Sequence, residues 1–286
     1  MYIYKTLENI SINTLHKAFI LAFSDYAIKL DIPIKRFENM LLRRGFNPNI
    51  SIGAFQEENL VGFIYNGLRL WNNKKTAYDT GTGVIKECRK KGITTSMFIE
   101  LKDELINQNI ECYILEVLKT NTPAFELYKK QGFKVIREFD CFKLDTTSCT
   151  FNKKYITENK SILNEDEWNE VKNLWDIEPS WQNSIDSIRA TIDSFIFSLI
   201  KDDNKIIGYG IIDKATGDIP QMAVHKEYRN RGIGISIVAN LIENTKSNVI
   251  SLINVDSSYS PMVKMLSSLG FNNSIGQYEM LLEFTK

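Results

Sequence analysis

Apolar and polar positions in the first half of the chain alternate in short runs that predict strands, and segments with the period of an amphipathic helix separate these runs. Gly81 and Gly83 interrupt the third strand, which predicts a bulge or a close approach of the backbone there. Thr122 and Pro123 are expected to begin the last helix, as its N-cap and first-turn residues. The predicted strands are 50–55, 60–70, 76–84, 112–118 and 133–144, and the predicted helices are 14–23, 33–43, 93–105 and 122–131.

The second half of the chain repeats this order, with helices at 166–175, 184–192, 233–243 and 260–269 and strands at 195–200, 206–212, 220–224, 248–255 and 277–284. Single residues recur as well: Gly62, Arg89, Gly92 and Gly132-Phe133 are answered by Gly208, Arg229, Gly232 and Gly270-Phe271. A repeat in one order predicts two homologous domains. We expect them at 1–147 and 155–286, each α/β with a mixed sheet, joined by the polar stretch 145–154.

Composition and charge exclude several classes of protein. The 286 residues include 35 basic and 35 acidic side chains, a balance that does not favour binding to nucleic acid or to an anionic membrane. The sequence shows no signal-peptide pattern and no membrane-spanning apolar run, so a cytoplasmic location is expected. Its four cysteines form no C-x-x-C pair and its two histidines lie far apart, which disfavours a metal site. Cys112 and Cys141 are expected in the core.

The repeated motif Arg-x-x-Gly-x-small, at 89–94 and 229–234, lies between a strand and a helix. A glycine-rich turn at the start of a helix binds anions, because unpaired backbone N–H groups and the helix dipole point at the ligand. Gly92 and Gly232 would let the main chain approach a phosphate closely. One such copy alone is typical of many ordinary helices.

A second motif, N-x-x-A-x-x-L-Y-x-x-x-G-F from Asn121 to Phe133, makes the pattern specific. Together the two motifs resemble the GNAT (GCN5-related N-acetyltransferase) superfamily, and the resemblance covers most of both halves. It implies two tandem GNAT-like domains, each a mixed, mostly antiparallel twisted sheet flanked by helices, and acetyl-CoA as cofactor. Thr94 departs from the usual Gly or Ala, although its hydroxyl can donate to a phosphate. The CoA-binding residues implied are Thr82, Gly83, Val84, Arg89, Lys90, Lys91, Gly92, Ile93, Thr94 and Asn121 in the first half, and Met222, Val224, Arg229, Arg231, Gly232, Ile233 and Gly234 in the second.

Acetyl transfer to a primary amine needs a base for the ammonium proton and an acid for the leaving thiolate. The resemblance implies Glu116 as the base and Tyr128 as the acid, with Asp79 as a competing base. Tyr128 could instead be a packing aromatic, and Glu116 could face solvent. The second half has Asn254 and Leu266 at the positions of Glu116 and Tyr128, and Tyr259 at that of Asn121. We therefore predict that the first half is catalytic and that the second is silent, although Asp256 or Tyr259 could restore some function.

The acceptor is expected to be a small-molecule amine or an exposed amino group, with Asp25, Tyr26, Tyr78 and Asp79 as candidate substrate contacts. The two domains are expected to contact each other, and a homodimer stays open. Two alternatives also stay open: catalysis in the second half, and a non-enzymatic acyl-CoA sensor or scaffold.

Overall fold

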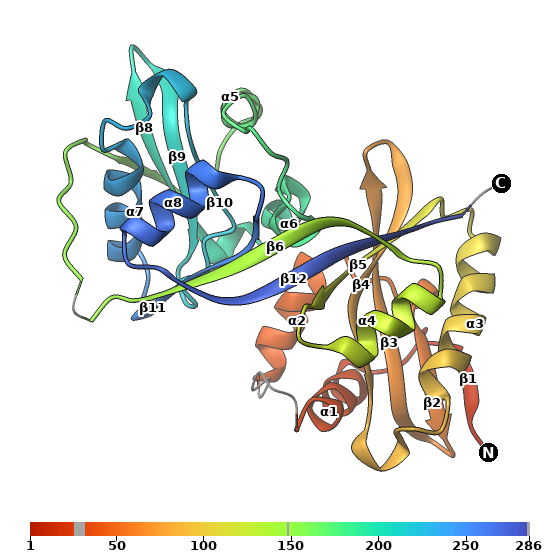
Figure 1. The fold of residues 1–286 in the computed structure, drawn as a ribbon. Coiled ribbons are helices and arrows are strands. Elements are labelled where there is room, and N and C mark those ends of the chain that lie inside the picture. Colours follow the sequence, from red (N-terminus) through yellow and green to blue (C-terminus); the bar gives the residue numbers. More distant parts are fainter. Residues whose placement is uncertain (26–31, 148, 285–286) are drawn as a thin grey trace. The chain divides into compact units, whose positions relative to one another are not determined.

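The computed structural model describes residues 1–25, 32–147 and 149–284. Contacts divide the chain into two compact units (Figure 1). The N-terminal unit comprises 1–117, 121–136 and 279–286, and the C-terminal unit comprises 118–120 and 137–278. No helix among the described residues is long and apolar enough to cross a membrane.

The N-terminal unit contains the strands β1-β2-β3-β4-β5-β12 of a mixed eight-stranded sheet, which continues with β6 and β11. The pairs β1–β2, β2–β3 and β3–β4 are antiparallel, whereas β4 and β5 are parallel. Gly132, at φ +99, ends α4 where the pattern places it. The elements of this half are β1 (Ile3–Thr6), α1 (Ile12–Ala22), α2 (Ile34–Arg43), β2 (Ile52–Gln56), β3 (Asn59–Trp71), β4 (Lys74–Val84), α3 (Ile93–Asn107), β5 (Cys112–Leu118), α4 (Thr122–Lys130) and β6 (Lys134–Asp145).

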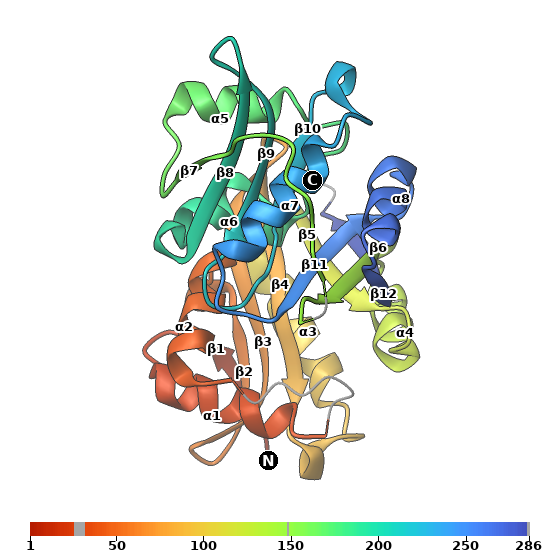
Figure 2. The same ribbon diagram turned by 90° about the vertical axis from the view of Figure 1, so that its left-hand side faces the viewer.

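Helices cover both faces of this sheet (Figure 2). A Cβ built on Gly83 would lie 3.0 Å from Ala22 in α1, whereas one built on Gly62 would lie 3.2 Å from Ile93 in α3. Because side chains alternate between the faces of a strand and the partner of Gly62 is the next residue, Val84, α1 and α3 lie on opposite faces. The glycines allow this close helix–sheet packing.

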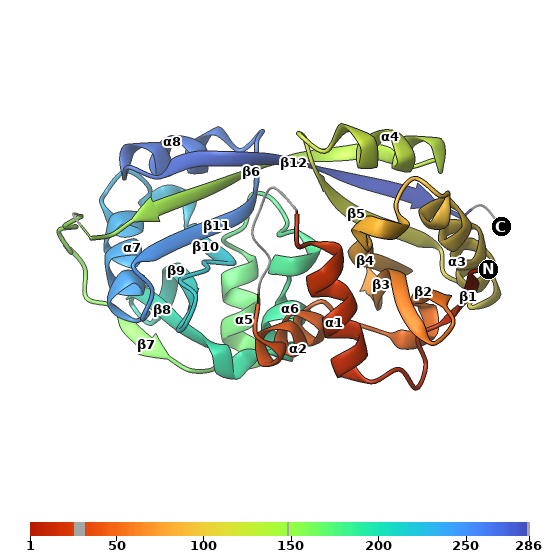
Figure 3. The ribbon, with the colours of Figure 1, turned by 90° about the horizontal axis from the view of Figure 1, so that it is seen from below.

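The C-terminal unit repeats the plan. The four-stranded sheet β10-β9-β8-β7 has α5 and α6 on one side and α7 on the other (Figure 3). Cβ atoms built on Gly208 and Gly210 would meet Ile237 of α7 at 3.0 and 2.6 Å. The elements are β7 (Glu158–Lys160), α5 (Glu165–Lys172), α6 (Ile185–Ala190), β8 (Phe195–Asp202), β9 (Lys205–Asp213), β10 (Gln221–Val224), α7 (Ile233–Glu243), β11 (Val249–Asp256), α8 (Ser260–Ser268) and β12 (Asn272–Glu283). The expected fold class, two α/β halves with mostly antiparallel sheets flanked by helices, is confirmed, although the parallel pair lies in the N-terminal unit and the four-stranded sheet of the C-terminal unit is antiparallel throughout.

The last strand of each half runs from one unit into the other. β6 begins in the N-terminal unit, and its residues 139–145 pair with β11 in the C-terminal unit. β12 begins in the C-terminal unit and ends in the N-terminal unit, beside β5, where the amide of Phe284 donates to the carbonyl of Glu111 at 2.9 Å. Each unit is therefore completed by a strand from the other half of the sequence. The domain boundaries 1–147 and 155–286 stay a prediction.

Candidate functional site

β4 and β5 separate in the N-terminal unit. Their parallel pairing covers Thr76–Tyr78 and Cys112–Ile114, whereas β4 continues to Val84 with β3 alone as its paired strand in that stretch. The register with β3 shifts at Thr80, which forms a bulge just before the predicted position at Gly81–Gly83. The edge of Thr82–Val84 that faces away from β3 therefore offers main-chain groups in the gap.

The loop before α3 has the backbone of an anion site. Lys90 and Gly92 have φ values of 61° and 76°, and Gly92 is the N-cap of α3 without a side-chain cap bond in the described structure. No described atom lies within 4 Å of a Cβ built on Gly92. The first N–H groups of a helix, here including that of Thr94, have no partner within the helix, and a phosphate bound beside Gly92 would find both donors and the positive end of the helix dipole.

Arg89 braces this loop from within. Its Nε donates to the carbonyl of Val84 at 3.0 Å, and its Nη2 donates to the carbonyl of Ala22 at 2.7 Å. Its two terminal nitrogens also hold Asp25 at 2.8 and 2.7 Å, and this bidentate pair lowers the pKa of Asp25. Arg89 therefore ties the loop to the end of α1, and the exposed Lys90 and Lys91 are the better placed cations for a ligand.

Asp79 and Tyr128 meet where the strands separate. Asp79 is 9% exposed and accepts hydrogen bonds from the Gly81 amide at 2.8 Å and the Thr82 hydroxyl at 2.7 Å. The phenol of Tyr128, from α4, lies 3.4 Å from the same carboxylate. Burial raises the pKa of Asp79 to about 6, although these hydrogen bonds act in the opposite direction. The ring of Tyr128 packs edge-on against Phe98, with ring centroids 5.8 Å apart, so it is both a packing aromatic and a donor at the site.

Glu116 lies on β5 and accepts a 2.8 Å hydrogen bond from the phenol of Tyr78. Burial, and next the charge of Glu116, raise the pKa of Tyr78 well above its ordinary value. Tyr78 therefore stays protonated and holds the carboxylate of Glu116. Tyr78 is almost fully buried, and Tyr26, the other tyrosine expected to contact substrate, lies outside the described residues.

Asn121, expected to contact CoA, is the N-cap of α4, and its Oδ1 accepts from the amide of Ala124 at 3.3 Å. The prediction that Thr122 caps this helix is wrong by one residue, because the asparagine is better placed for the amide of the first turn. Pro123 is in the first turn, as expected.

The C-terminal unit contains a second loop of the same construction. Asn230 and Gly232 have φ values of 61° and 94°. The Nε of Arg229 donates to the carbonyl of Val224 at 3.0 Å, and its Nη2 donates to Asp176. A Cβ on Gly234 would lie 2.8 Å from the sulfur of Met265, so a larger residue at this position would require Met265 to move.

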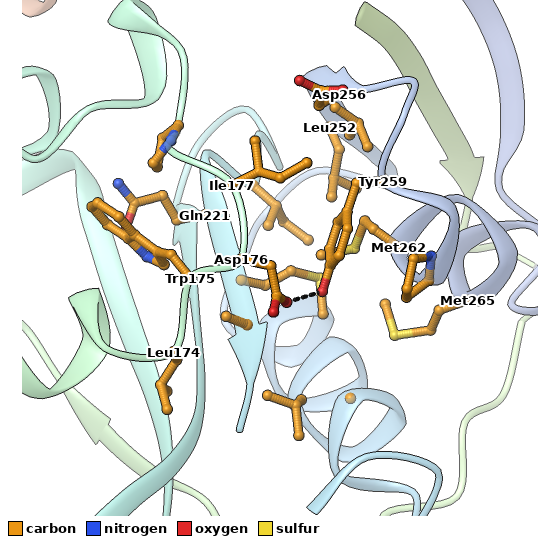
Figure 4. A pocket seen from close by; sticks show the side chains of 18 of the residues that line it. Leu174, Trp175, Asp176, Ile177, Gln221, Leu252, Asp256, Tyr259, Met262 and Met265 are labelled. Atoms are coloured by element: carbon orange, nitrogen blue, oxygen red, sulfur yellow. Dashed lines mark hydrogen bonds between the residues drawn. The ribbon is translucent and has the colours of Figure 1, made fainter. Parts of the chain in front are cut away.

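A cavity of about 600 Å³ lies in the C-terminal unit, and residues of the loop 229–234 form part of its lining. β10 pairs with β9 and β11 pairs with β6, so β10 and β11 separate as β4 and β5 do. Figure 4 shows the walls: the segment 174–177 on one side, and β11 and α8 on the other. Met222, Val224 and Ile233, expected at a CoA site, line the cavity, and so do Arg229, Gly232 and Gly234. Arg231 lies beside it, with its guanidinium over the ring of Tyr228.

The C-terminal unit has Asn254, Tyr259 and Leu266 at the positions that correspond to Glu116, Asn121 and Tyr128. These residues do not reproduce the candidate base and acid of the N-terminal unit. Asn254 is buried, donates to Ser180 at 3.0 Å and accepts from Gln277 at 2.8 Å. Leu266 is a fully buried core residue. Tyr259 donates its phenol proton to Asp176.

Sequence reasoning missed Asp176 and Gln221. Gln221 joins the phenol of Tyr209 at 2.9 Å to the carbonyl of Asn183 at 2.6 Å on the cavity floor. Asp176 is the counterpart of Asp25, but it lies 53 positions before its arginine whereas Asp25 lies 64 before. This difference in spacing hides the correspondence from a search for repeats.

Comparisons with known proteins agree with this architecture. The family model described as "Acetyltransferase (GNAT) family" matches residues 14–133 and 161–271. A search of curated protein sequences gives no match.

Several solved structures have the same fold. A tandem GNAT protein from the clavulanic acid biosynthesis pathway matches with a TM-score of 0.74 at 13% identity, over 99% of this chain and 98% of that one. A GCN5-related N-acetyltransferase from Sphaerobacter thermophilus matches with a TM-score of 0.73 at 12% identity, over 99% and 95%. One from Anabaena variabilis matches with a TM-score of 0.61 at 14% identity, over 98% and 72%. The two matched segments cover most of the chain and coincide with its two halves, and the chain therefore belongs to the GNAT acetyltransferase family.

Proposed function

We propose that the protein is an acetyl-CoA-dependent N-acetyltransferase that acts on a primary amine, and that the N-terminal unit performs the reaction. The observation that carries this proposal is the approach of Tyr128 to Asp79, 3.4 Å apart, at the point where β4 and β5 separate. A buried carboxylate with a pKa of about 6 is an efficient base near neutral pH.

The residues of the N-terminal unit fit CoA. The open space at Gly92 and the donors at the start of α3 suit the pyrophosphate, with Lys90 and Lys91 beside them. The main-chain groups of Thr82–Val84 suit the pantetheine amides. Bound acetyl-CoA would supply the acetyl group as a thioester.

The chain's own groups would then move two protons. Asp79 or Glu116 accepts a proton from the acceptor ammonium, directly or through water, which frees the amine lone pair for attack. Tyr128 holds its phenol proton in the gap, where the thiolate is released. Transfer from a phenol of pKa ~10 to a thiolate of pKa ~8.5 is slightly uphill, so a hydrogen bond to the sulfur is the larger part of the effect. Acidic groups at the site also favour a cationic acceptor.

The pH profile separates the two candidate bases. With an acceptor amine that ionises well above this range, we expect kcat/KM to fall about tenfold for each pH unit below about 6, because Asp79 must be deprotonated to act. Asp79→Asn should remove this limb and lower kcat/KM by about 10²-fold or more, whereas Glu116→Gln should retain the limb. A limb that persists in Asp79→Asn and disappears in Glu116→Gln would instead identify Glu116 as the base.

The C-terminal unit is the second candidate for catalysis, because it has the cavity and the glycine at position 234. A matched pair of variants separates the two units. Gly92→Val and Gly232→Val both place a β-branched residue at positive φ, at 76° and 94°, and put a side chain where a phosphate would lie. We expect Gly92→Val to raise the KM for acetyl-CoA at least about tenfold, and Gly232→Val to leave turnover within about twofold. The reverse result would assign catalysis to the C-terminal unit.

The absence of turnover across a broad panel of amines, despite tight acetyl-CoA binding, would favour an acyl-CoA sensor. A thermal-shift screen of amines with CoA present would find the acceptor, since a ligand that binds the folded state raises the melting temperature.

A further inference from the structure

Asp176 crosses the cavity of the C-terminal unit. It lies in the segment after α5, and its Oδ2 accepts hydrogen bonds from two other elements: from Arg229 of the anion loop and from the phenol of Tyr259 at the start of α8. Figure 4 shows the bond between Asp176 and Tyr259 running from one wall of the cavity to the other. Both residues line the cavity. A ligand that extends from the loop into the gap between β10 and β11 must therefore pass this bond.

The electrostatics keep this contact in place near neutral pH. Burial would raise the pKa of Asp176, but the hydrogen bonds from Tyr259 and Arg229 outweigh it and lower the pKa. Burial, and next the bond to Asp176, raise the pKa of Tyr259 to about 12. The carboxylate therefore stays charged and the phenol stays protonated, and a hydrogen bond to a charged acceptor is one of the stronger kinds in proteins.

Tyr259 precedes α8, at a position where Asn, Asp, Ser or Thr would stabilise the helix by capping it. It is the N-cap of α8, and the described structure gives α8 no side-chain cap bond. In the N-terminal unit the corresponding residue is Asn121, which caps α4. Tyrosine thus gives up the stabilising cap bond, and its phenol reaches Asp176 instead.

From this geometry we propose that the Asp176–Tyr259 bond is a latch across the C-terminal cavity, which must open before CoA can reach or leave the loop Arg229–Gly234 and which closes again behind it. The latch would slow the exchange of the ligand without changing its affinity. This proposal rests on the family assignment of this half as a CoA-binding unit, and it does not require the C-terminal unit to be catalytic.

Stopped-flow fluorescence of the full chain with CoA tests the latch. Trp175 lines the cavity, so the signal that is lost in Trp175→Phe reports on this site rather than on the N-terminal unit. We expect Tyr259→Phe, which keeps the ring and removes the donor, to raise both the association and the dissociation rate constants about tenfold, with Kd nearly unchanged. Tyr4→Phe, which removes a phenol from β1 of the N-terminal unit, should leave both rates unchanged.

Three results would overturn the latch. Equal rates in wild type and Tyr259→Phe would show that the bond does not limit entry. A rise in the dissociation rate alone would make Tyr259 a ligand contact. The absence of any Trp175-dependent signal, with CoA well above saturation of the N-terminal unit, would show that CoA does not enter this cavity. None of these results bears on the proposed acetyl transfer, which steady-state turnover of the Asp79 and Gly92 variants measures separately.

Discussion

Replacement of Tyr128 by phenylalanine is expected to lower kcat about 10²-fold and to change the KM for acetyl-CoA by less than about twofold. A positioned acid contributes about 10²–10⁴-fold to a rate, and the phenol of Tyr128 lies 3.4 Å from Asp79, next to the point where the pairing of β4 with β5 ends. Phenylalanine keeps the edge-on contacts with Phe98 and Phe133. The fold should therefore survive, and release of CoA thiol in steady state measures the loss.

Two controls distinguish an acid from a structural residue. Tyr155→Phe, in the hydrophobic cluster of the C-terminal unit, removes a phenol elsewhere and should leave kcat unchanged. A more acidic leaving thiol needs less help from a proton donor. An acetyl thioester of such a thiol should therefore reduce the difference in kcat between wild type and Tyr128→Phe. A loss of the same size with every leaving group would contradict the role of Tyr128 as the acid.

Removal of residues 279–286 is expected to unfold the N-terminal unit, although none of the residues removed belongs to the first half of the sequence. The deleted segment contains the buried Met280 and Glu279, at 0% and 1% exposure. Burial of Met280 alone stabilises the fold by about 2 kcal/mol. The deletion also removes the bond from Phe284 to Glu111 and the ion pair of Glu283 with Lys74, at 2.8 Å. The deletion also removes the part of β12 that lies beside β5, and so exposes the edge of β5 that faces away from β4.

Hydrogen exchange measures this effect directly. Amides of β4 and β5 should lose most of their protection in the shortened chain, whereas amides of β8 and β9 should keep theirs. A synthetic peptide of residues 272–286, added in trans, should restore protection in part. Full protection of β5 in the shortened chain would contradict the assignment of the end of β12 to the N-terminal unit. For the same reason, separate expression of the two halves is a poor test of which one is catalytic.

The sequence predicts the local elements well because each depends on neighbouring residues. The apolar run of β3, the glycine before α3 and the Gly-Phe pair after α4 are short-range signals, and the structure has the corresponding elements. The boundaries differ where a competing side chain is adjacent, as when Asn121 rather than Thr122 caps α4.

Long-range pairing cannot be predicted in this way. β6 and β12 both follow a Gly-Phe pair, and this local signal does not specify which of them lies beside β5. The contacts of Asp25 with Arg89 and of Asp176 with Arg229 have the same limitation. In the sequence, nothing distinguishes either aspartate from the other acidic residues, of which the chain has 35 in all. The fold places each aspartate next to its arginine.

The path of β12 also has a consequence for how the protein is made. Translation proceeds from the N-terminus at roughly 5–20 residues per second, and domains commonly fold as they emerge from the ribosome. Here the strand beside β5 is synthesised after residues 137–278 of the C-terminal unit, so the edge of the N-terminal unit at β5 stays open while those residues are being added. An open strand edge is a template for wrong pairing. We therefore expect the nascent chain to depend on chaperones until residues 279–284 have been made and can pair with β5, so that both units are completed together.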